Sequence, residues 1–251
     1  MGSLGRRPRR GIAVINCSRA DGVTALTLNR PETGNALGPA LVEALIAEVG
    51  ATCRSGETHT LVLRGAGKHF CTGLDLSDLD GLSDGDLLLR LVRIETLLAL
   101  LWHAPIRTMA VAHGRTWGAG ADLFAACEQR VAVAGASFRF PGAQFGILLG
   151  TRRLSERVGT DVARVLVVDG GTLDAAQAMA CGLASLAVEP PVLAAPLVEA
   201  SVAAAVRSAT RADQRDADMA ALVRSAAVPG LQARVSAYRQ AQLAARGRAG
   251  R

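Results

Sequence analysis

The sequence predicts a mixed α/β protein whose last quarter is helical. Short β-prone runs alternate with segments of helical apolar spacing through most of the chain, which is the pattern of strands stacked on helices. Two glycine-containing loops, each between a predicted strand and a predicted helix, repeat this arrangement. The alanine-rich sequence near the C-terminus has helical spacing only. We therefore expect an α/β core followed by a helical region.

The core opens with a predicted β-hairpin. Its strands are Ile12–Cys17 and Val23–Leu28, and Asp21-Gly22 between them is typical of a tight turn. Apolar spacing and β-prone runs then predict a helix, a strand, an amphipathic helix that ends before Pro105, and two further strands. These elements are, in order, Pro39–Cys53, Thr60–Arg64, Asp84–Trp102, Arg107–Ala112 and Arg130–Ala134.

The second half of the chain is predicted to be mostly helical. The expected elements are a turn over Arg152–Val158, helices over Asp161–Val168 and Leu173–Ala180, a strand over Ala184–Val188, and helices over Val192–Val206, Ala212–Ala226 and Leu231–Arg246. We divide the chain into residues 1–10, a basic tail expected to be disordered, residues 11–190, the α/β core, and residues 191–251, the helical region.

Composition excludes several classes of protein. Half of the residues are hydrophobic, which is enough for a packed core without disulfides. The five cysteines form no C-x-x-C pair, and neither a secretory signal nor a transmembrane segment is recognisable, so we expect a cytoplasmic protein that does not insert into membranes. Much of the net charge of +6 comes from arginines at the two ends, and aromatic residues make up only 3% of the chain. This pattern disfavours nucleic-acid binding.

The sequence contains no complete form of several common cofactor-binding and catalytic motifs. The GAGKHF segment from Gly65 to Phe70 lacks the third glycine of a dinucleotide-binding fingerprint, and His69 stands where a P-loop needs serine or threonine. No G-x-S-x-G sequence is present, which disfavours a serine hydrolase. The four histidines are scattered singly, so no metal site is predicted. A Rossmann oxidoreductase is left as the weakest alternative.

Four segments together resemble the crotonase, or enoyl-CoA hydratase/isomerase, family. They occur in the family's order and at about its spacing, and they span about two-thirds of the chain. The segments are LNRPETGNAL at 28–37, RGAGKHFCTGLDL at 64–76, HGRTWGAGADL at 113–123 and GTLDAAQAMACGLASLAV at 171–188. The resemblance implies a ββα spiral core and a C-terminal trimerisation region, in a trimer or hexamer. It also implies an acyl-CoA thioester substrate, with coenzyme A as part of that substrate and no other cofactor.

The resemblance places two backbone donors of an oxyanion hole. In the family's pattern these donors are the residue after the glycine of a G-x-D segment and the second residue of a glycine-rich turn, which here are Leu74 and Ala119. A thioester carbonyl gains negative charge when a proton leaves its α-carbon or a nucleophile adds at its β-carbon. Preorganised N–H groups stabilise that charge, and a helix that begins near Ala119 also favours an anion.

The carboxylates of this chain differ from those of the family's hydratases. Hydratases use one glutamate at the position of Asp122 and a second in a later P-E pair, where this chain has Pro141-Gly142. Aspartate is shorter by one bond of about 1.5 Å. Family isomerases with aspartate at the Asp122 position also use acids in the later segment, where this chain has Gly142, Leu149 and Gly150. Asp122 is the candidate acid/base. The hydration mechanism that uses two glutamates lacks its second carboxylate in this chain.

Other polar residues near the motifs have secondary expectations. The resemblance implies Arg30 and Lys68 as contacts of coenzyme A, and solvated loop charges are the alternative. Asp75 is expected to hold its own loop. No role is assigned to Cys71, and Arg152-Arg153 is interpreted as a pair of surface arginines in preference to pocket residues.

Two functions from different classes follow. The first is an enzyme that stabilises a thioester enolate and uses Asp122 in a lyase or isomerase reaction of fatty acid metabolism. The second is a non-catalytic acyl-CoA-binding protein that has kept the two amides and lost the pair of carboxylates.

Overall fold

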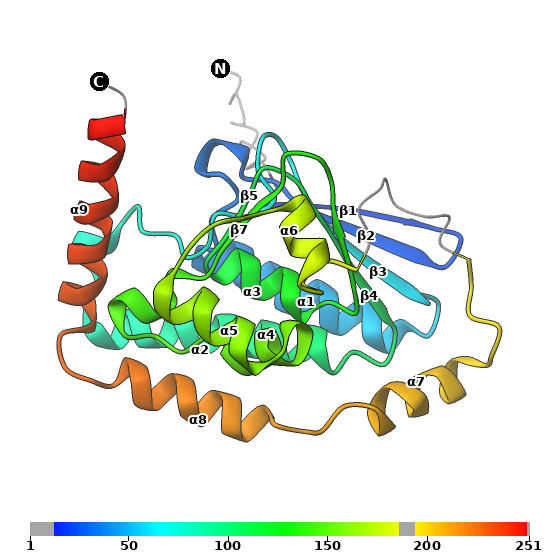
Figure 1. Cartoon of the computed structure of the whole chain (residues 1–251). Helices are drawn as coiled ribbons and strands as arrows, with labels where there is room; N and C mark the ends of the chain where they lie inside the picture. Colours follow the sequence, from blue (N-terminus) through cyan, green and yellow to red (C-terminus); the bar gives the residue numbers. More distant parts are fainter. Residues whose placement is uncertain (1–12, 186–193, 250–251) are drawn as a thin grey trace, which may run out of the picture.

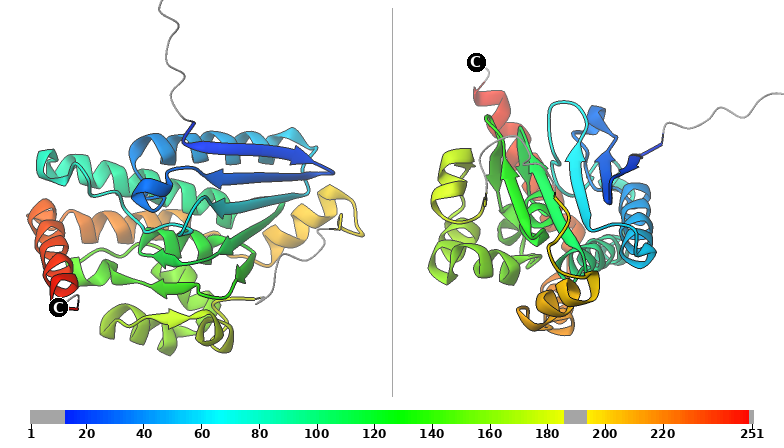
Figure 2. Two further views of the ribbon diagram at one scale, coloured as in Figure 1. Left: turned by 90° about the horizontal axis from the view of Figure 1, so that it is seen from above. Right: turned by 90° about the vertical axis from the view of Figure 1, so that its right-hand side faces the viewer.

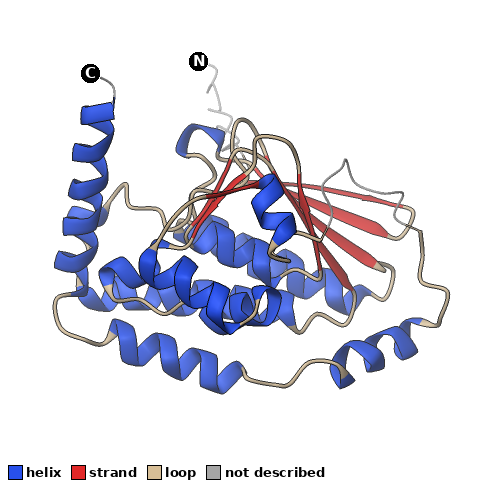
Figure 3. Ribbon diagram, in the orientation of Figure 1, coloured by secondary structure: helices blue, strands red, loops and turns tan. Residues whose placement is uncertain are grey.

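The computed structural model describes residues 13–185 and 194–249, so the predicted basic tail over residues 1–10 lies outside the described residues. The strands lie in two sheets, and helices cover one side of the larger sheet (Figures 1 and 3). The strands are β1 (Ile15–Ala20), β2 (Val23–Leu28), β3 (Thr60–Gly65), β4 (Arg107–Ala112), β5 (Arg115–Trp117), β6 (Gln129–Ala132), β7 (Ser137–Arg139) and β8 (Leu173–Asp174). The helices are α1 (Pro39–Ser55), α2 (Asp84–Trp102), α3 (Ala119–Ala126), α4 (Thr151–Val158), α5 (Thr160–Arg164), α6 (Ala175–Ala180), α7 (Ala200–Ala209), α8 (Arg215–Ala226) and α9 (Leu231–Ala249).

The larger sheet has the strand order β1-β2-β3-β4-β6. Strands β1 and β2 form the predicted antiparallel hairpin, and Asp21 and Gly22 both have the positive φ angles of its tight turn, 49° and 70°. The other neighbours pair in parallel. Parallel neighbours need crossover connections, and α1, α2 and α3 lie in those connections.

A smaller sheet of order β5-β7-β8 was not predicted from the sequence. Strands β5 and β7 pair in parallel, and β8 pairs antiparallel with β7. Each of these strands has only two or three residues, which is too short to show a period of two. The smaller sheet matters for function because β5 leads directly into α3.

The main hydrophobic core lies between the larger sheet and α1, α2 and α3. Strand β2 alternates along its length, with Leu26 and Leu28 fully buried. Helix α2 has the bounds that its apolar spacing predicts. It begins at a capping box, in which Ser83 Oγ accepts from Asp86 N at 3.1 Å and Asp86 Oδ2 accepts from Ser83 N at 2.9 Å.

The C-terminal region is helical, as predicted. Helices α7 and α8 run along the helical side of the core, and α9 stands at one end of the molecule (Figures 1 and 2). A second hydrophobic cluster holds α8 and α9 against α2, and its buried members include Leu87, Leu91, Leu222, Leu231 and Val235. No described helix is long and apolar enough to cross a membrane.

Several predicted bounds differ from those of the structure. Helix α7 begins at Ala200, whereas apolar spacing predicted a helix over Val192–Val206; residues 192 and 193 lie outside the described part. Alanine-rich sequence does not mark where a helix begins, and no capping side chain precedes α7. The predicted turn at 152–158 is helix α4, and the helix predicted at 161–168 is divided into α5 and a π-helical turn, Val165–Asp169. Residues 184 and 185 of the predicted strand Ala184–Val188 form no strand, and residues 186–188 lie outside the described part.

Candidate active site

A cavity of about 260 Å³ lies between the core and the C-terminal helix α9. Most of the lining residues belong to the loop after β3, the start of α3, the segment from 139 to 154 and one face of α9. Most of its wall is apolar, and the apolar side chains include Leu74, Leu76, Leu91, Phe140, Phe145, Ile147, Leu149, Leu154, Val167, Val235 and Leu243. A mostly apolar cavity with a few polar groups is typical of a small-molecule site.

Two loops that are far apart in the sequence meet at one wall of this cavity. Cys71 N donates to Arg115 O at 3.3 Å, and Trp117 N donates to Cys71 O at 3.0 Å, so residue 71 pairs with β5 as an isolated bridge. The contact continues at Gly73, where a Cβ atom would lie 2.8 Å from Trp117 O and 3.4 Å from Ala119 N. Glycine at position 73 is therefore required for this close approach.

The backbone around Leu74 turns its N–H group away from Leu37. Leu37 N donates to Gly73 O at 2.7 Å and Asp75 N donates to Leu37 O at 3.3 Å. In this parallel bridge both bonds belong to the neighbours of Leu74, so its own N–H points away from Leu37. The planar peptide between Gly73 and Leu74 has the same consequence, because its C=O is directed at Leu37 N and its N–H therefore points the opposite way.

The N–H of Ala119 also makes no hydrogen bond within helix α3. Helix α3 begins at Ala119, and its first bonds run from Ala121 N and Asp122 N to Gly118 O at 2.8 and 3.0 Å. Ala119 and Gly120 therefore keep amides without an intrahelical acceptor. Gly120 packs directly on the Cys71 carbonyl, where a Cβ would lie 2.8 Å from the Cys71 carbonyl carbon. The structure thus places Leu74 and Ala119 at the wall of one cavity.

Asp122 lies in the same cavity and is only 6% exposed. Its carboxylate accepts no hydrogen bond from the described residues, and it lies against Gly150, where a Cβ would be 2.9 Å from the Cβ of Asp122. Burial raises the pKa of Asp122 well above its usual range, and the negative charge of Glu95 raises it further, while the positive charge of Arg153 opposes them. A buried carboxyl with a raised pKa is typical of a group that transfers protons.

No second carboxylate lines the cavity among the described residues. Gly142, at the position where hydratases carry their second glutamate, does line it. A Cβ at Gly142 would lie 2.9 Å from Ile147 O, and Ile147 N donates to Gly142 O at 2.9 Å. The backbone around residue 147 therefore occupies the space beside Gly142.

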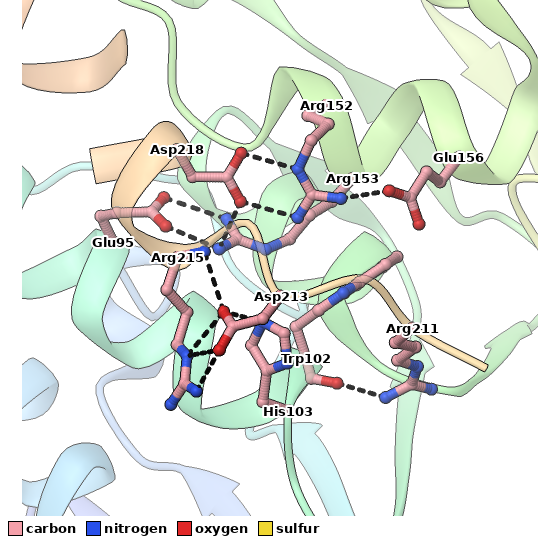
Figure 4. A network of polar contacts seen from close by, with 10 residues as sticks. All are labelled: Glu95, Trp102, His103, Arg152, Arg153, Glu156, Arg211, Asp213, Arg215 and Asp218. Carbon is pink, nitrogen blue, oxygen red and sulfur yellow. Dashed lines mark hydrogen bonds and ion pairs between the residues drawn. The ribbon is translucent and has the colours of Figure 1, made fainter. Parts of the chain in front are cut away.

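The interpretation of Arg152-Arg153 as surface arginines is wrong for Arg153. Its side chain is 1% exposed and makes two bonds to Glu95 of α2, at 3.0 and 2.6 Å (Figure 4). Arg152 is partly exposed and pairs with Asp218 of α8 and with Glu156. Sequence patterns did not reveal this burial because the partners of Arg153 are far away along the chain. A charged residue on the core side of a helix, such as Glu95 between Leu91 and Leu98, was the signal that could have revealed it.

Other residues singled out from the sequence lie outside the cavity wall. Arg30 Nη1 donates to Asp75 Oδ2 at 2.7 Å and to Ala36 O at 3.1 Å. Asp75 Oδ1 also accepts from Ser77 N at 3.0 Å, so Asp75 holds its own loop, as predicted. Lys68 is exposed on the loop after β3. Cys71 is fully buried, and burial raises the pKa of its thiol to about 12, so it is an inert core residue.

No group of three or more potential metal ligands occurs among residues 13–185 and 194–249.

The sequence matches the Enoyl-CoA hydratase/isomerase family over residues 18–246. The chain belongs to the enoyl-CoA hydratase/isomerase family. The predicted resemblance is therefore confirmed, and the spiral fold of the crotonases is the fold of this family member.

Individual relatives agree with this family assignment. The probable enoyl-CoA hydratase EchA14 of Mycobacterium tuberculosis is 33% identical over 212 residues, which are 83% of this chain and 80% of that protein. The mouse enoyl-CoA hydratase domain-containing protein 2, mitochondrial, is 32% identical over 171 residues, which are 66% of this chain but only 58% of that protein.

Solved structures show the same fold. A crystal structure from Bordetella parapertussis that bears the family's name, enoyl-CoA hydratase/isomerase, superposes with a TM-score of 0.87 at 42% identity. The match covers 90% of this chain and 98% of that one. An enoyl-CoA hydratase from Bacillus halodurans superposes with a TM-score of 0.78 over 89% and 99% of the two chains; at 20% identity this likeness concerns the fold alone.

Proposed function

We propose that this protein is an enzyme that binds an acyl-CoA thioester and moves a proton on its acyl chain. The N–H groups of Leu74 and Ala119 hold the thioester oxygen, and Asp122 carries the proton. The observation that supports this most directly is the position of Asp122. It is a buried carboxyl in the same apolar cavity as both amides, and no second carboxylate lines that cavity among the described residues.

The two amides supply charge stabilisation. When a proton leaves the α-carbon of a thioester, its electron pair moves onto the carbonyl oxygen and an enolate forms. Backbone N–H groups that have no acceptor in the protein bind such an oxygen without reorganising, and removing one donor of this kind typically costs about 2.7–4 kcal/mol of activation free energy. The dipole of α3, which begins at Ala119, adds to the positive potential.

A single carboxylate suits a 1,3-proton shift better than a hydration. In a 3-enoyl thioester, the Asp122 carboxylate takes a proton from C2 and the electrons move onto the thioester oxygen. The Asp122 carboxyl then returns this proton to C4, and the double bond moves from C3=C4 to C2=C3. One group gives and takes the same proton, and the reaction needs no cofactor beyond the coenzyme A of the substrate. Hydration also needs a water activated by a second group, whose place is taken here by Gly142.

The raised pKa of Asp122 supports this role. A base removes an α-proton best when its pKa is close to the working pH, and an ordinary aspartate is too weak a base. Burial, followed by the nearby charge of Glu95, raises the pKa of Asp122. The ionised fraction needed for the first step should therefore increase with pH over a higher range than for an ordinary aspartate.

The decisive experiment is proton exchange in heavy water. We expect the protein to replace the α-protons of butyryl-CoA by deuterium, measured by mass spectrometry, and to isomerise a 3-enoyl-CoA. Asp122→Asn should reduce both rates by about 10²–10⁴-fold while the Kd for butyryl-CoA changes little. Glu43→Gln, on the exposed side of α1, is the control and should behave as the wild type.

The alternative is a non-catalytic acyl-CoA-binding protein. The observation that favours it is the absence of a second carboxylate from the described wall of the cavity. Binding of acyl-CoA without exchange or turnover, for any enoyl-, dienoyl-, malonyl- or hydroxyacyl-CoA, would establish this alternative and exclude the enzyme.

The coenzyme A contacts and the assembly are further parts of the proposal. Lys68 is exposed and free of ion pairs with the described residues, so Lys68→Ala should weaken CoA binding; Arg30 acts mainly through its pair with Asp75.

The family resemblance implies a trimer or hexamer, and apolar side chains on α7 and before it are exposed, at Leu197, Val198, Val202 and Val206. Light scattering on the purified protein measures this state. A cytoplasmic location is still a prediction, and the mouse relative is named mitochondrial.

A further inference from the structure

Arg153 and Glu95 form a buried ion pair that does not line the cavity. The proposed reaction alone does not explain this pair. The side chains of Arg153 and Glu95 are 1% and 2% exposed. Arg153 Nη1 donates to Glu95 Oε2 at 3.0 Å and Arg153 Nη2 to Glu95 Oε1 at 2.6 Å. Asp218 Oδ2 approaches Arg153 Nη2 at 3.1 Å, and Arg152 holds Asp218 in turn, so the pair is part of a network between α2, α4 and α8 (Figure 4).

Stability is a weak explanation for this pair. Removing two charges from water is costly, and apolar side chains of similar volume at such sites are often as stabilising or more so. The network is also incomplete, because Arg153 Nε is buried with no hydrogen-bond partner among the described residues. A position of this kind points to a functional use of the charges.

The pair is connected to Asp122 through the start of α4. Helix α4 follows Gly150, which lies against the Asp122 carboxylate, and Arg153 is in the first turn of that helix. Helix α3, which carries Asp122, contacts both α2 and α4. Glu95 and Arg153, which are paired with each other, have opposite effects on Asp122: the charge of Glu95 raises its pKa and the charge of Arg153 lowers it.

Other charged groups near Asp122 belong to different elements. Asp218 and Arg152 lie beyond the ion pair, Glu156 lies beyond Arg152, and Arg139 and Arg239 line the cavity that Asp122 faces. Arg239 is itself paired with Asp80 and bonded to Leu76 O. The charges that shift the pKa of the Asp122 carboxyl are those of Glu95 and Arg153.

We propose that Glu95 and Arg153 are positioning residues that control proton transfer by Asp122, although neither touches the substrate. Glu95 favours the protonated form of the Asp122 carboxyl, and Arg153 opposes this effect. The inference rests on the proposed function of Asp122, but it concerns a property of the protein alone and can be measured without substrate.

The test is a direct titration of Asp122 in the full chain. Protein labelled with carbon-13 at the aspartate carboxyl is titrated by NMR, and the Asp122 resonance is identified by its absence from Asp122→Asn. Glu95→Gln should lower the midpoint and Arg153→Met should raise it, each by about one pH unit. The pH dependence of α-proton exchange into butyryl-CoA should move in the same two directions.

The double variant Glu95→Gln/Arg153→Met keeps the test decisive if a single variant fails to fold, because it leaves no partner of the pair as an unpaired buried charge. Its midpoint should lie below that of the wild type, since Glu95 has the larger influence on Asp122 of the two. Arg93→Gln, which removes an exposed partner of Glu43 on the same helix as Glu95, is the control and should leave the midpoint unchanged.

Two results would overturn the inference. One is a double variant that titrates like the wild type, and the other is a pair of single variants whose midpoints move in the same direction. If the midpoints move as expected but no thioester exchanges protons, the proposed function fails and the electrostatic inference stands. The two hypotheses are thus distinguishable.

Discussion

The backbone of Gly150 lies directly against the carboxylate of Asp122. A Cβ atom at position 150 would overlap with Oδ1 and would lie 2.9 Å from the Cβ of Asp122. The φ of Gly150 is +68°, which side chains other than glycine rarely adopt. The position and rotamer of Asp122 therefore depend on the absence of a side chain at the start of α4.

We expect Gly150→Ala to displace Asp122 and lower the rate of α-proton exchange by about 10²-fold, since a shift of about 1 Å at a reacting group has effects of this size. Binding of CoA should be retained. Deuterium incorporation into butyryl-CoA measures the rate, and calorimetry measures binding.

Gly159→Ala is the matched control. Gly159 follows the same helix, has a φ of +81° and has open space where a Cβ would be. Both variants should lose stability because both positions have a positive φ, but only Gly150→Ala should lose exchange. Equal rates for the two variants would contradict the role assigned to Gly150.

A second prediction concerns the approach of the two loops. Gly73→Ala places a methyl group 2.8 Å from Trp117 O and 3.4 Å from Ala119 N, so it should separate the amides of Leu74 and Ala119. We expect a fall of about 10²–10³-fold in kcat for enolate formation, the range found when one oxyanion donor is lost.

The control for Gly73 is Gly56→Ala, at a C-terminal cap with a φ of +71° and no neighbouring atom within 4 Å of the added Cβ. Kinetics with a 3-enoyl-CoA compare the two variants. An unchanged kcat in Gly73→Ala would show that the two amides do not act together.

A third prediction follows from the raised pKa of Asp122. Because the folded protein holds this proton more tightly than the unfolded chain, whose value is near 3.8, the stability contributed by Asp122 is present below that pH. It is lost as the pH rises through the folded-state pKa. Asp122→Asn should therefore raise the Tm relative to the wild type at pH 8, by an amount equivalent to about 1–3 kcal/mol, and have much less effect at pH 4.

Replacing Asp75 should change the Tm in the opposite direction, so Asp75 serves as the comparison. Burial raises the pKa of Asp75, but hydrogen bonds from Arg30 and Ser77 outweigh it and lower the pKa overall. Its stabilising contribution is present at neutral pH and lost as the pH falls, so Asp75→Asn should lower the Tm at pH 8. Thermal unfolding followed by circular dichroism tests both variants, and shifts of the same sign would contradict the assignment.

The fourth prediction concerns the wall that α9 provides. Leu243 lines the cavity and is 58% exposed, so it lies at the rim, where a longer acyl chain would cover it. Leu243→Asp should weaken binding of octanoyl-CoA by about fivefold, as expected for the loss of about 1 kcal/mol of apolar contact, and leave acetyl-CoA binding unchanged. Ala244→Asp, at an exposed position outside the cavity wall, should bind both thioesters like the wild type.

Local patterns in the sequence predicted the long elements well. Helix α2 has the predicted bounds, Asp84–Trp102, because its apolar spacing and Pro105 mark the same segment. The short strands β5, β7 and β8 were not predicted, since two or three residues carry no period and their pairing depends on distant partners.

In the candidate site, too, the sequence predicted the residues of local motifs but not the contacts between distant residues. The family pattern predicted Leu74 and Ala119 as donors and Asp122 as the acid/base, and all three residues line one cavity in the structure. The burial of Arg153 could not be predicted from its neighbours, because Glu95 and Asp218 come from helices on either side of it in the sequence. Likewise, nothing local distinguished Arg30 as the partner of Asp75.

The contribution of α9 to the cavity has a consequence for biosynthesis. Residues 235–243 form part of the cavity wall, although the core that carries Asp122 is complete in sequence long before them. A growing chain on the ribosome would thus have its core strands and Asp122 available while the apolar cavity was still open on one side. The cavity of the proposed site would be closed only after α9 had emerged and packed against Phe145 and Ile147.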